Sequence, residues 1–108
     1  MSNMVIDSQT ANKVVVNSLE KYIDIVDPKI FTRIEDKSLK YYAIEVLEEK
    51  DNQRKTRILY INNRDYIDLL ASGLKDSNIK VSNIVTNVKH NKISYLITYK
   101  LVPNHRRK

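Results

Sequence analysis

Apolar and polar residues alternate with a period of two in residues 29–61 and again in residues 79–102, and this alternation restricts the fold of the 108-residue chain more than any other feature. Tyr42, Ile44 and Val46, for example, occupy every second position of their segment. Successive side chains of a β-strand point to opposite faces of a sheet, so the pattern predicts strands with one buried and one exposed face.

The first segment is expected to form three antiparallel strands, with turns near residues 35–38 and 50–53. A turn at Asp51-Asn52 places Glu49 opposite Arg54, and the same register places Glu48 opposite Lys55. Opposite charges that face each other across strands stabilise a hairpin. We therefore interpret the densely charged residues 48–57 as a self-neutralised hairpin tip.

The second segment is expected to form a long hairpin with its turn at His90-Asn91. This register pairs Val88 with Ile93, Ile84 with Ile97 and Ser82 with Tyr99. One face of the hairpin then belongs to the core and the other is mostly polar. The residues expected on the polar face include Asn83, Asn87, Ser94, Thr98 and Lys100.

Two helices are expected beside these strands. Apolar residues at helical spacing predict a first helix over residues 9–26, capped by Ser8 and ended by Asp27-Pro28. A second, short helix is expected to begin after Asn62 or Asn63. Gly73 is expected to end it as the C′ residue.

The expected order of elements is α-β-β-β-α-β-β. This order predicts an α+β fold in which an antiparallel sheet has its helices packed on one face. Residues 1–102 are expected to form a single domain, and residues 103–108 a basic C-terminal tail. The sequence shows no internal repeat.

The composition narrows the function classes. The chain has no cysteine, which excludes disulfides and thiolate zinc sites, and it shows no signal peptide or membrane-spanning run, so we expect a cytoplasmic protein. His90 and His105 are far apart and lack clustered acids, so neither a metal nor a cofactor is expected. The protein is not expected to be an enzyme. A metal-dependent nuclease built on Glu45, Glu48 and Lys50 is a remote alternative.

The charge distribution is the main functional signal. Residues 1–76 hold 12 basic and 13 acidic residues, whereas residues 77–108 hold 7 basic residues and no acid. Such asymmetry favours an anionic partner, and lysine or arginine contacts with phosphates favour nucleic acid. The expected nucleic-acid-binding residues are Lys80, Asn83, Asn87, Lys89, Lys92, Lys100, Arg106, Arg107 and Lys108.

Other interpretations remain open at this point. Ile, Asn, Lys and Tyr make up 44 of the 108 residues, so an AT-rich genome could account for part of the lysine excess. Exposed tyrosines and free strand edges are also typical of protein-interaction modules, such as a small accessory or inhibitor protein of a virus or plasmid. We expect a homodimer, and the sequence does not distinguish DNA from RNA.

Overall fold

The computed structural model describes residues 1–103, so the predicted basic tail lies largely outside the described residues. The described residues form an α+β fold, as predicted. The strands are β1 (Ser2–Asp7), β2 (Val26–Glu35), β3 (Ser38–Lys50), β4 (Gln53–Ile61), β5 (Ile79–Lys89) and β6 (Lys92–Leu101). The helices are α1 (Ser8–Leu19) and α2 (Asn63–Lys75).

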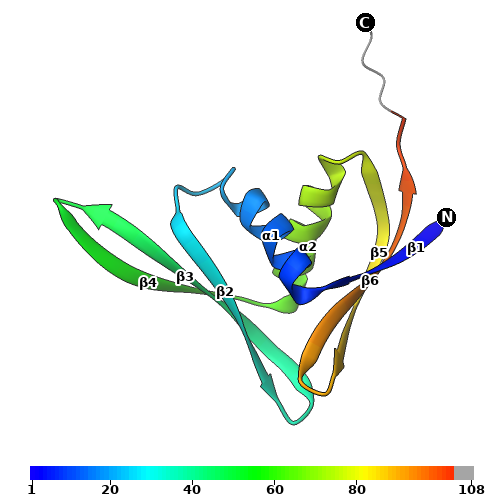
Figure 1. Cartoon of the computed structure of the whole chain (residues 1–108), viewed down its shortest axis with the longest axis horizontal. Coiled ribbons are helices and arrows are strands. Elements are labelled where there is room, and N and C mark those ends of the chain that lie inside the picture. Colours follow the sequence, from blue (N-terminus) through cyan, green and yellow to red (C-terminus); the bar gives the residue numbers. More distant parts are fainter. Residues whose placement is uncertain (104–108) are drawn as a thin grey trace, which may run out of the picture.

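The strands form two antiparallel sheets of three strands each, in the orders β1-β6-β5 and β2-β3-β4. The two sheets diverge like the arms of a V, and both helices lie between them (Figure 1). The inner faces of both sheets pack on the helices, which leaves the two outer faces exposed. The sequence did not predict β1 or the division of the strands into two sheets.

The chain contains the unit β-α-β-β twice, as β1-α1-β2-β3 and β4-α2-β5-β6. Each unit contributes its first strand to the sheet of the other unit, because β1 pairs with β6 and β4 pairs with β3. The rows of residues across the two sheets correspond. Thr32–Tyr42–Ile61 in one sheet matches Thr86–Tyr95–Ile6 in the other. The expectation of no internal repeat was therefore wrong at the level of structure.

Three two-residue turns explain the hairpins. Both central residues of each turn have positive φ, which suits the right-handed twist of the flanking strands. The turns at Asp51-Asn52 and His90-Asn91 lie where the sequence predicted them. The predicted register of β3 with β4 is confirmed, and so are the pairs Val88–Ile93 and Ile84–Ile97. The predicted Ser82–Tyr99 pair was wrong, because a register shift at Ser82 pairs Val81 with Tyr99.

The first helix is shorter than predicted, since α1 ends at Leu19 and Val26 already belongs to β2. Asp7, not Ser8, is its N-cap, and the Asp7 carboxylate accepts a hydrogen bond of 2.8 Å from the backbone N–H of Thr10. Pro28 does not end a helix. It lies in the edge strand β2 at a register shift, a position where proline is tolerated.

Gly73 lies inside α2 and is not a C′ residue, because the helix continues to Lys75 and Gly73 has no positive φ. The glycine is required by the crossing of the two helices. A Cβ atom on Gly73 would lie 2.4 Å from Val14 Cγ1 and 2.7 Å from Ser18 Oγ. The Ser18 hydroxyl in turn donates a hydrogen bond of 2.8 Å to the carbonyl of Leu69.

Three fully buried tyrosines lie at the centre of the core, where the two units meet. The rings of Tyr42 and Tyr66 stack with centroids 3.9 Å apart, and Tyr95 lies 5.5 Å beyond Tyr66. The hydroxyls of Tyr42 and Tyr95 are 2.7 Å apart. The Asn63 side-chain oxygen accepts hydrogen bonds from both Tyr42 and Thr86, so polar atoms of this centre are satisfied.

Candidate nucleic-acid interface

The outer face of the β1-β6-β5 sheet collects the sequence-predicted binding residues that the structure describes. Directly opposed residues of an antiparallel pair share a face, and β5 and β6 oppose Lys80 to Lys100 and Lys89 to Lys92. Asn83 and Asn87 lie on this face too, opposite Thr98 and Ser94. The predicted residues on this face are Lys80, Asn83, Asn87, Lys89, Lys92 and Lys100.

The lysines form two like-charged pairs at the two ends of the hairpin. Lys92 and Lys100 are eight residues apart on β6, which corresponds to about 27 Å along a strand. None of the four lysines takes part in an ion pair among residues 1–103. Like charges directly opposite each other destabilise a sheet, so this arrangement has a cost that an anionic ligand would offset.

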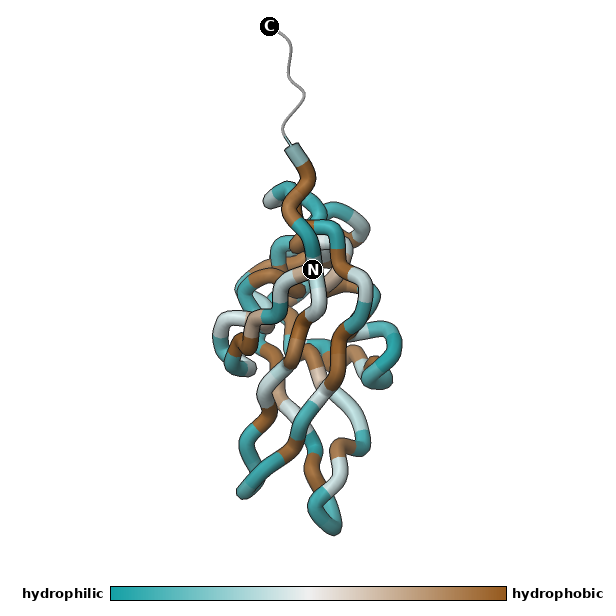
Figure 2. The backbone as a smooth tube through the Cα atoms, turned by 90° about the vertical axis from the view of Figure 1, so that its right-hand side faces the viewer, coloured by the Kyte–Doolittle hydropathy of each residue, from teal (hydrophilic) through white to brown (hydrophobic). Residues whose placement is uncertain are grey.

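Strand β1 adds residues to this face that the sequence interpretation missed. Asn3 and Val5 oppose Thr98 and Leu96, and the Thr98 hydroxyl donates a hydrogen bond of 2.9 Å to Asn3. The alternation of exposed Asn3 and Val5 with the core-facing Met4 and Ile6 was the available signal. The side of the molecule formed by these strands faces the viewer in Figure 2, where hydrophilic and hydrophobic residues alternate along the chain.

Asp7 is the one acidic residue on this face within residues 1–103, and it is already used by α1. The backbone N–H of Thr10 donates to the Asp7 carboxylate, and this hydrogen bond lowers the pKa of Asp7. The charge of Asp7 therefore caps a helix, and among residues 1–103 the lysines at the ends of the hairpin form no ion pair with a carboxylate.

Other residues singled out in the sequence take different places. Arg106, Arg107, Lys108 and His105 lie outside the described residues. Arg57 lies on β4 of the other sheet and donates a hydrogen bond of 2.9 Å to Glu48. This arginine therefore does not join the lysines on the outer face of the β1-β6-β5 sheet, which we call the lysine face. Because Glu45 and Glu48 are three residues apart on β3, they point to opposite faces of the sheet. Residues 1–103 contain no group of three or more His, Asp or Glu side chains that could hold a metal ion.

The outer face of the β2-β3-β4 sheet differs in character. Phe31, Tyr41 and Tyr60 lie on three adjacent strands and are 53%, 38% and 64% exposed. Tyr41 and Tyr60 meet edge to face, with ring centroids 5.3 Å apart. The small side chain of Ala43 lies between Phe31 and Tyr60 in the same row. Tyr41 and Tyr42 are adjacent on β3 and point to opposite faces, so Tyr41 is exposed whereas Tyr42 is fully buried.

Comparison with known proteins adds no assignment, because no protein-family model, curated protein or solved structure matches the chain. Neither helix in the described part of the chain is long and apolar enough to cross a membrane.

Proposed function

We propose that the protein binds DNA or RNA through the outer face of the β1-β6-β5 sheet, together with the basic C-terminal residues. The proposal rests on two pairs of lysines, Lys80–Lys100 and Lys89–Lys92, which oppose each other on one exposed face. Lysines that contact phosphates release counterions from the nucleic acid, and this release gives affinity without sequence preference.

The side chains between the lysine pairs fit this role. Asn83, Asn87 and Thr98 offer hydrogen-bond donors and acceptors to sugars, phosphates or base edges. The separation of about 27 Å corresponds to roughly eight nucleotides of one strand of a duplex. We infer that contacts with the backbone dominate and that sequence specificity is low.

The experiment measures binding to generic DNA and RNA at increasing salt concentration. The protein is compared with a Lys80→Gln/Lys100→Gln variant and with a chain that ends at Pro103. Loss of two phosphate contacts is expected to lower the slope of log K against log salt by about 1.4–1.8. The shortened chain lacks Arg106, Arg107 and Lys108, and it too is expected to bind more weakly.

A matched control removes the same formal charge elsewhere. Lys50 and Lys55 lie at the β3–β4 hairpin tip, on the other arm of the V (Figure 1). A Lys50→Gln/Lys55→Gln variant is expected to keep most of the slope. Equal losses in both variants would contradict a defined interface, and no binding by the intact protein at low salt would refute the proposal and favour a protein partner.

The homodimer expected from the sequence belongs to the same proposal. Strands β1, β5, β2 and β4 are sheet edges, and unpaired edges are available for pairing with a second copy. A solution mass twice the 12.7 kDa of one chain supports the dimer, and a mass of one chain contradicts it.

A further inference from the structure

We propose that the outer face of the β2-β3-β4 sheet is a stacking platform for the bases of single-stranded nucleic acid. This inference rests on the proposed nucleic-acid function and adds a second site and a ligand class to it. Phe31, Tyr41 and Tyr60 supply the rings, and Lys29 and Arg33 supply cations for the phosphates. The rings come from three adjacent strands of one sheet.

The exposure of the rings is the first reason. Phe31 and Tyr60 are more than half exposed, although aromatic side chains usually bury most of their surface. They lie on either side of Ala43, and the small methyl group of this alanine does not cover the sides of the two rings that face each other. Exposed rings on the face of an antiparallel sheet are suited to stack with unpaired bases, because every base has a π-face.

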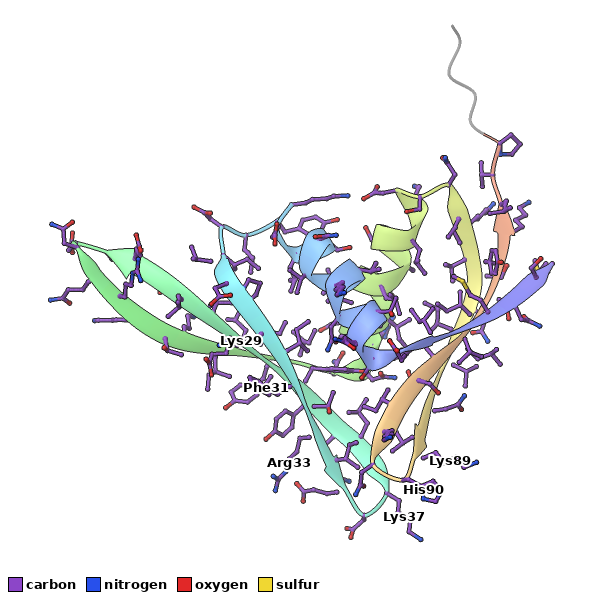
Figure 3. The ribbon with its side chains drawn as sticks, viewed as in Figure 1. Lys29, Phe31, Arg33, Lys37, Lys89 and His90 are labelled. Carbon is purple, nitrogen blue, oxygen red and sulfur yellow. The ribbon has the colours of Figure 1, made fainter. Side chains whose placement is uncertain are left out.

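The position of the cations is the second reason. Lys29, Phe31 and Arg33 alternate along β2 and project from the same side of it, away from the helices (Figure 3). Lys29 and Arg33 are thus each two residues from Phe31, which corresponds to about 7 Å along the strand. A base stacked on Phe31 would place its flanking phosphates near them. The central part of a protein–protein interface, in contrast, is depleted in lysine.

Three carboxylates on this face do not block the site, and one of them, Glu49, lies toward the β3–β4 hairpin tip in a pair with Arg54. Glu45 is opposite Lys29 in the register, and Glu35 accepts a hydrogen bond of 3.1 Å from Arg33. Both partners of the Arg33–Glu35 pair are at least half exposed, and exposed pairs contribute little. A phosphate can therefore replace Glu35 as the partner of the Arg33 guanidinium.

The platform connects with the lysine face through the hairpin tips. Lys37 lies at the tip of the β2–β3 hairpin, and Lys89 and His90 lie at the tip of the β5–β6 hairpin (Figure 3). The two hairpins are neighbours, because Thr32 of β2 lines the same cavity of about 660 Å³ as residues 89–94. A single strand could thus pass from the rings across the tips to Lys92.

The test compares oligonucleotides that differ only in their bases. Fluorescence anisotropy measures binding of a single strand of about 12 nucleotides, of the same strand with abasic sites, and of the duplex. Phe31→Ala and Tyr60→Ala are each expected to weaken single-strand binding by roughly 5- to 150-fold and to leave duplex binding unchanged. The abasic strand loses stacking on every ring, so it is expected to bind the intact protein at least as weakly as the normal strand binds Phe31→Ala.

The control and a second variant keep the result interpretable. Tyr22 follows α1 and is 69% exposed, so Tyr22→Ala removes a similar ring away from the platform and is expected to leave binding unchanged. Phe31→Leu retains apolar bulk on the strand but cannot stack, and it is expected to behave like Phe31→Ala. Circular dichroism checks that each variant is folded.

Three results would overturn the platform while leaving the proposed function intact. The first is unchanged single-strand binding by Phe31→Ala. The second is an equal loss of single-strand and duplex binding in that variant. The third is unchanged single-strand binding by Phe31→Leu. If Phe31→Ala keeps its binding but converts a dimer to a monomer, the face is occupied by a second copy instead. If the intact protein binds none of the three oligonucleotides, the proposed function itself is refuted.

Discussion

Replacing Gly73 with alanine tests the helix crossing at the centre of the fold. On an exposed helix this change stabilises a protein by roughly 0.8–1.0 kcal/mol, because alanine has the higher helix propensity. Here the new Cβ atom would lie 2.4 Å from Val14 Cγ1, 2.7 Å from Ser18 Oγ and 3.1 Å from the Val14 carbonyl oxygen. Ordinary carbon–carbon contacts are about 3.5–4.0 Å.

The neighbours of Gly73 have little freedom to move away. Val14 is β-branched and therefore restricted in χ1 within a helix. Ser18 is 1% exposed, and its hydroxyl is held by the Leu69 carbonyl. Overpacking costs about 1–3 kcal/mol, and three simultaneous close contacts place this site near the upper end. Subtracting the gain in propensity leaves a net destabilisation of about 2 kcal/mol.

Urea and thermal unfolding followed by circular dichroism measure this change. A loss of about 2 kcal/mol lowers the Tm of a domain of this size by roughly 8–15 °C. The control Ser72→Ala alters propensity on the same helix and is expected to change stability by less than about 0.7 kcal/mol. Combining Gly73→Ala with Val14→Ala removes the closest clash, so the pair should cost at least about 1 kcal/mol less than the sum of the single changes. A Gly73→Ala protein as stable as the parent, or strictly additive effects, would refute the reasoning.

Two further predictions concern the buried tyrosines and the charged hairpin tip. Burial raises the pKa of Tyr42, Tyr66 and Tyr95 above the ordinary value near 10. The stability that these neutral phenols contribute is therefore fully present below about pH 10. Above that pH the free energy of unfolding falls by up to about 1.4 kcal/mol per pH unit for each phenol. Absorbance of tyrosinate should show these three phenols ionising together with alkaline unfolding, and their ionisation in the folded protein near pH 10 would contradict their burial. Arg57→Ala breaks an exposed pair with Glu48 and is expected to cost less than about 1 kcal/mol in urea unfolding, so a larger loss would show that residues 48–57 do more than close a hairpin.

The hairpins could be predicted because their determinants are local. Alternation fixes which side chains face the core, and a two-residue turn then fixes the register. The grouping of Lys89 with Lys92 follows directly from that register, whereas Lys80 meets Lys100 only because of the register shift at Ser82. The lysine face was therefore predictable near the β5–β6 turn and not at its far end.

The errors arose where distant parts of the chain decide the local structure. Tyr22 and Val26 fit a helical spacing, but both are largely exposed, and pairing of Val26 with Leu47 places it in a strand. Gly73 has the local signature of a helix end, whereas its role is set by α1. Strand β1 has only Met4 and Ile6 as core positions, so its pattern is too short to recognise.

The duplication was hidden for a related reason. Structurally equivalent residues are 55 positions apart at the helix caps (Asp7 and Asn62) and 54 apart at Thr32 and Thr86. They are only 53 apart at Tyr42 and Tyr95, because β2 and β3 contain an additional register shift. A search at a constant period does not detect such a repeat. The aromatic platform could not be predicted from the sequence, because its rings lie on three separate strands that only the folded sheet brings together.

The exchange of first strands has a consequence for synthesis on the ribosome. β1 pairs with residues 94–99, whereas the β2-β3-β4 sheet is complete once residue 61 has emerged. At about 5–20 residues per second, β1 remains without its hydrogen-bonding partner for roughly 5–20 s. During that interval Met4 and Ile6 lie on an open strand edge, the kind of surface that templates aggregation. All three strands of the β2-β3-β4 sheet are thus synthesised long before β6, and β1 stays open to unwanted pairing until β6 reaches it.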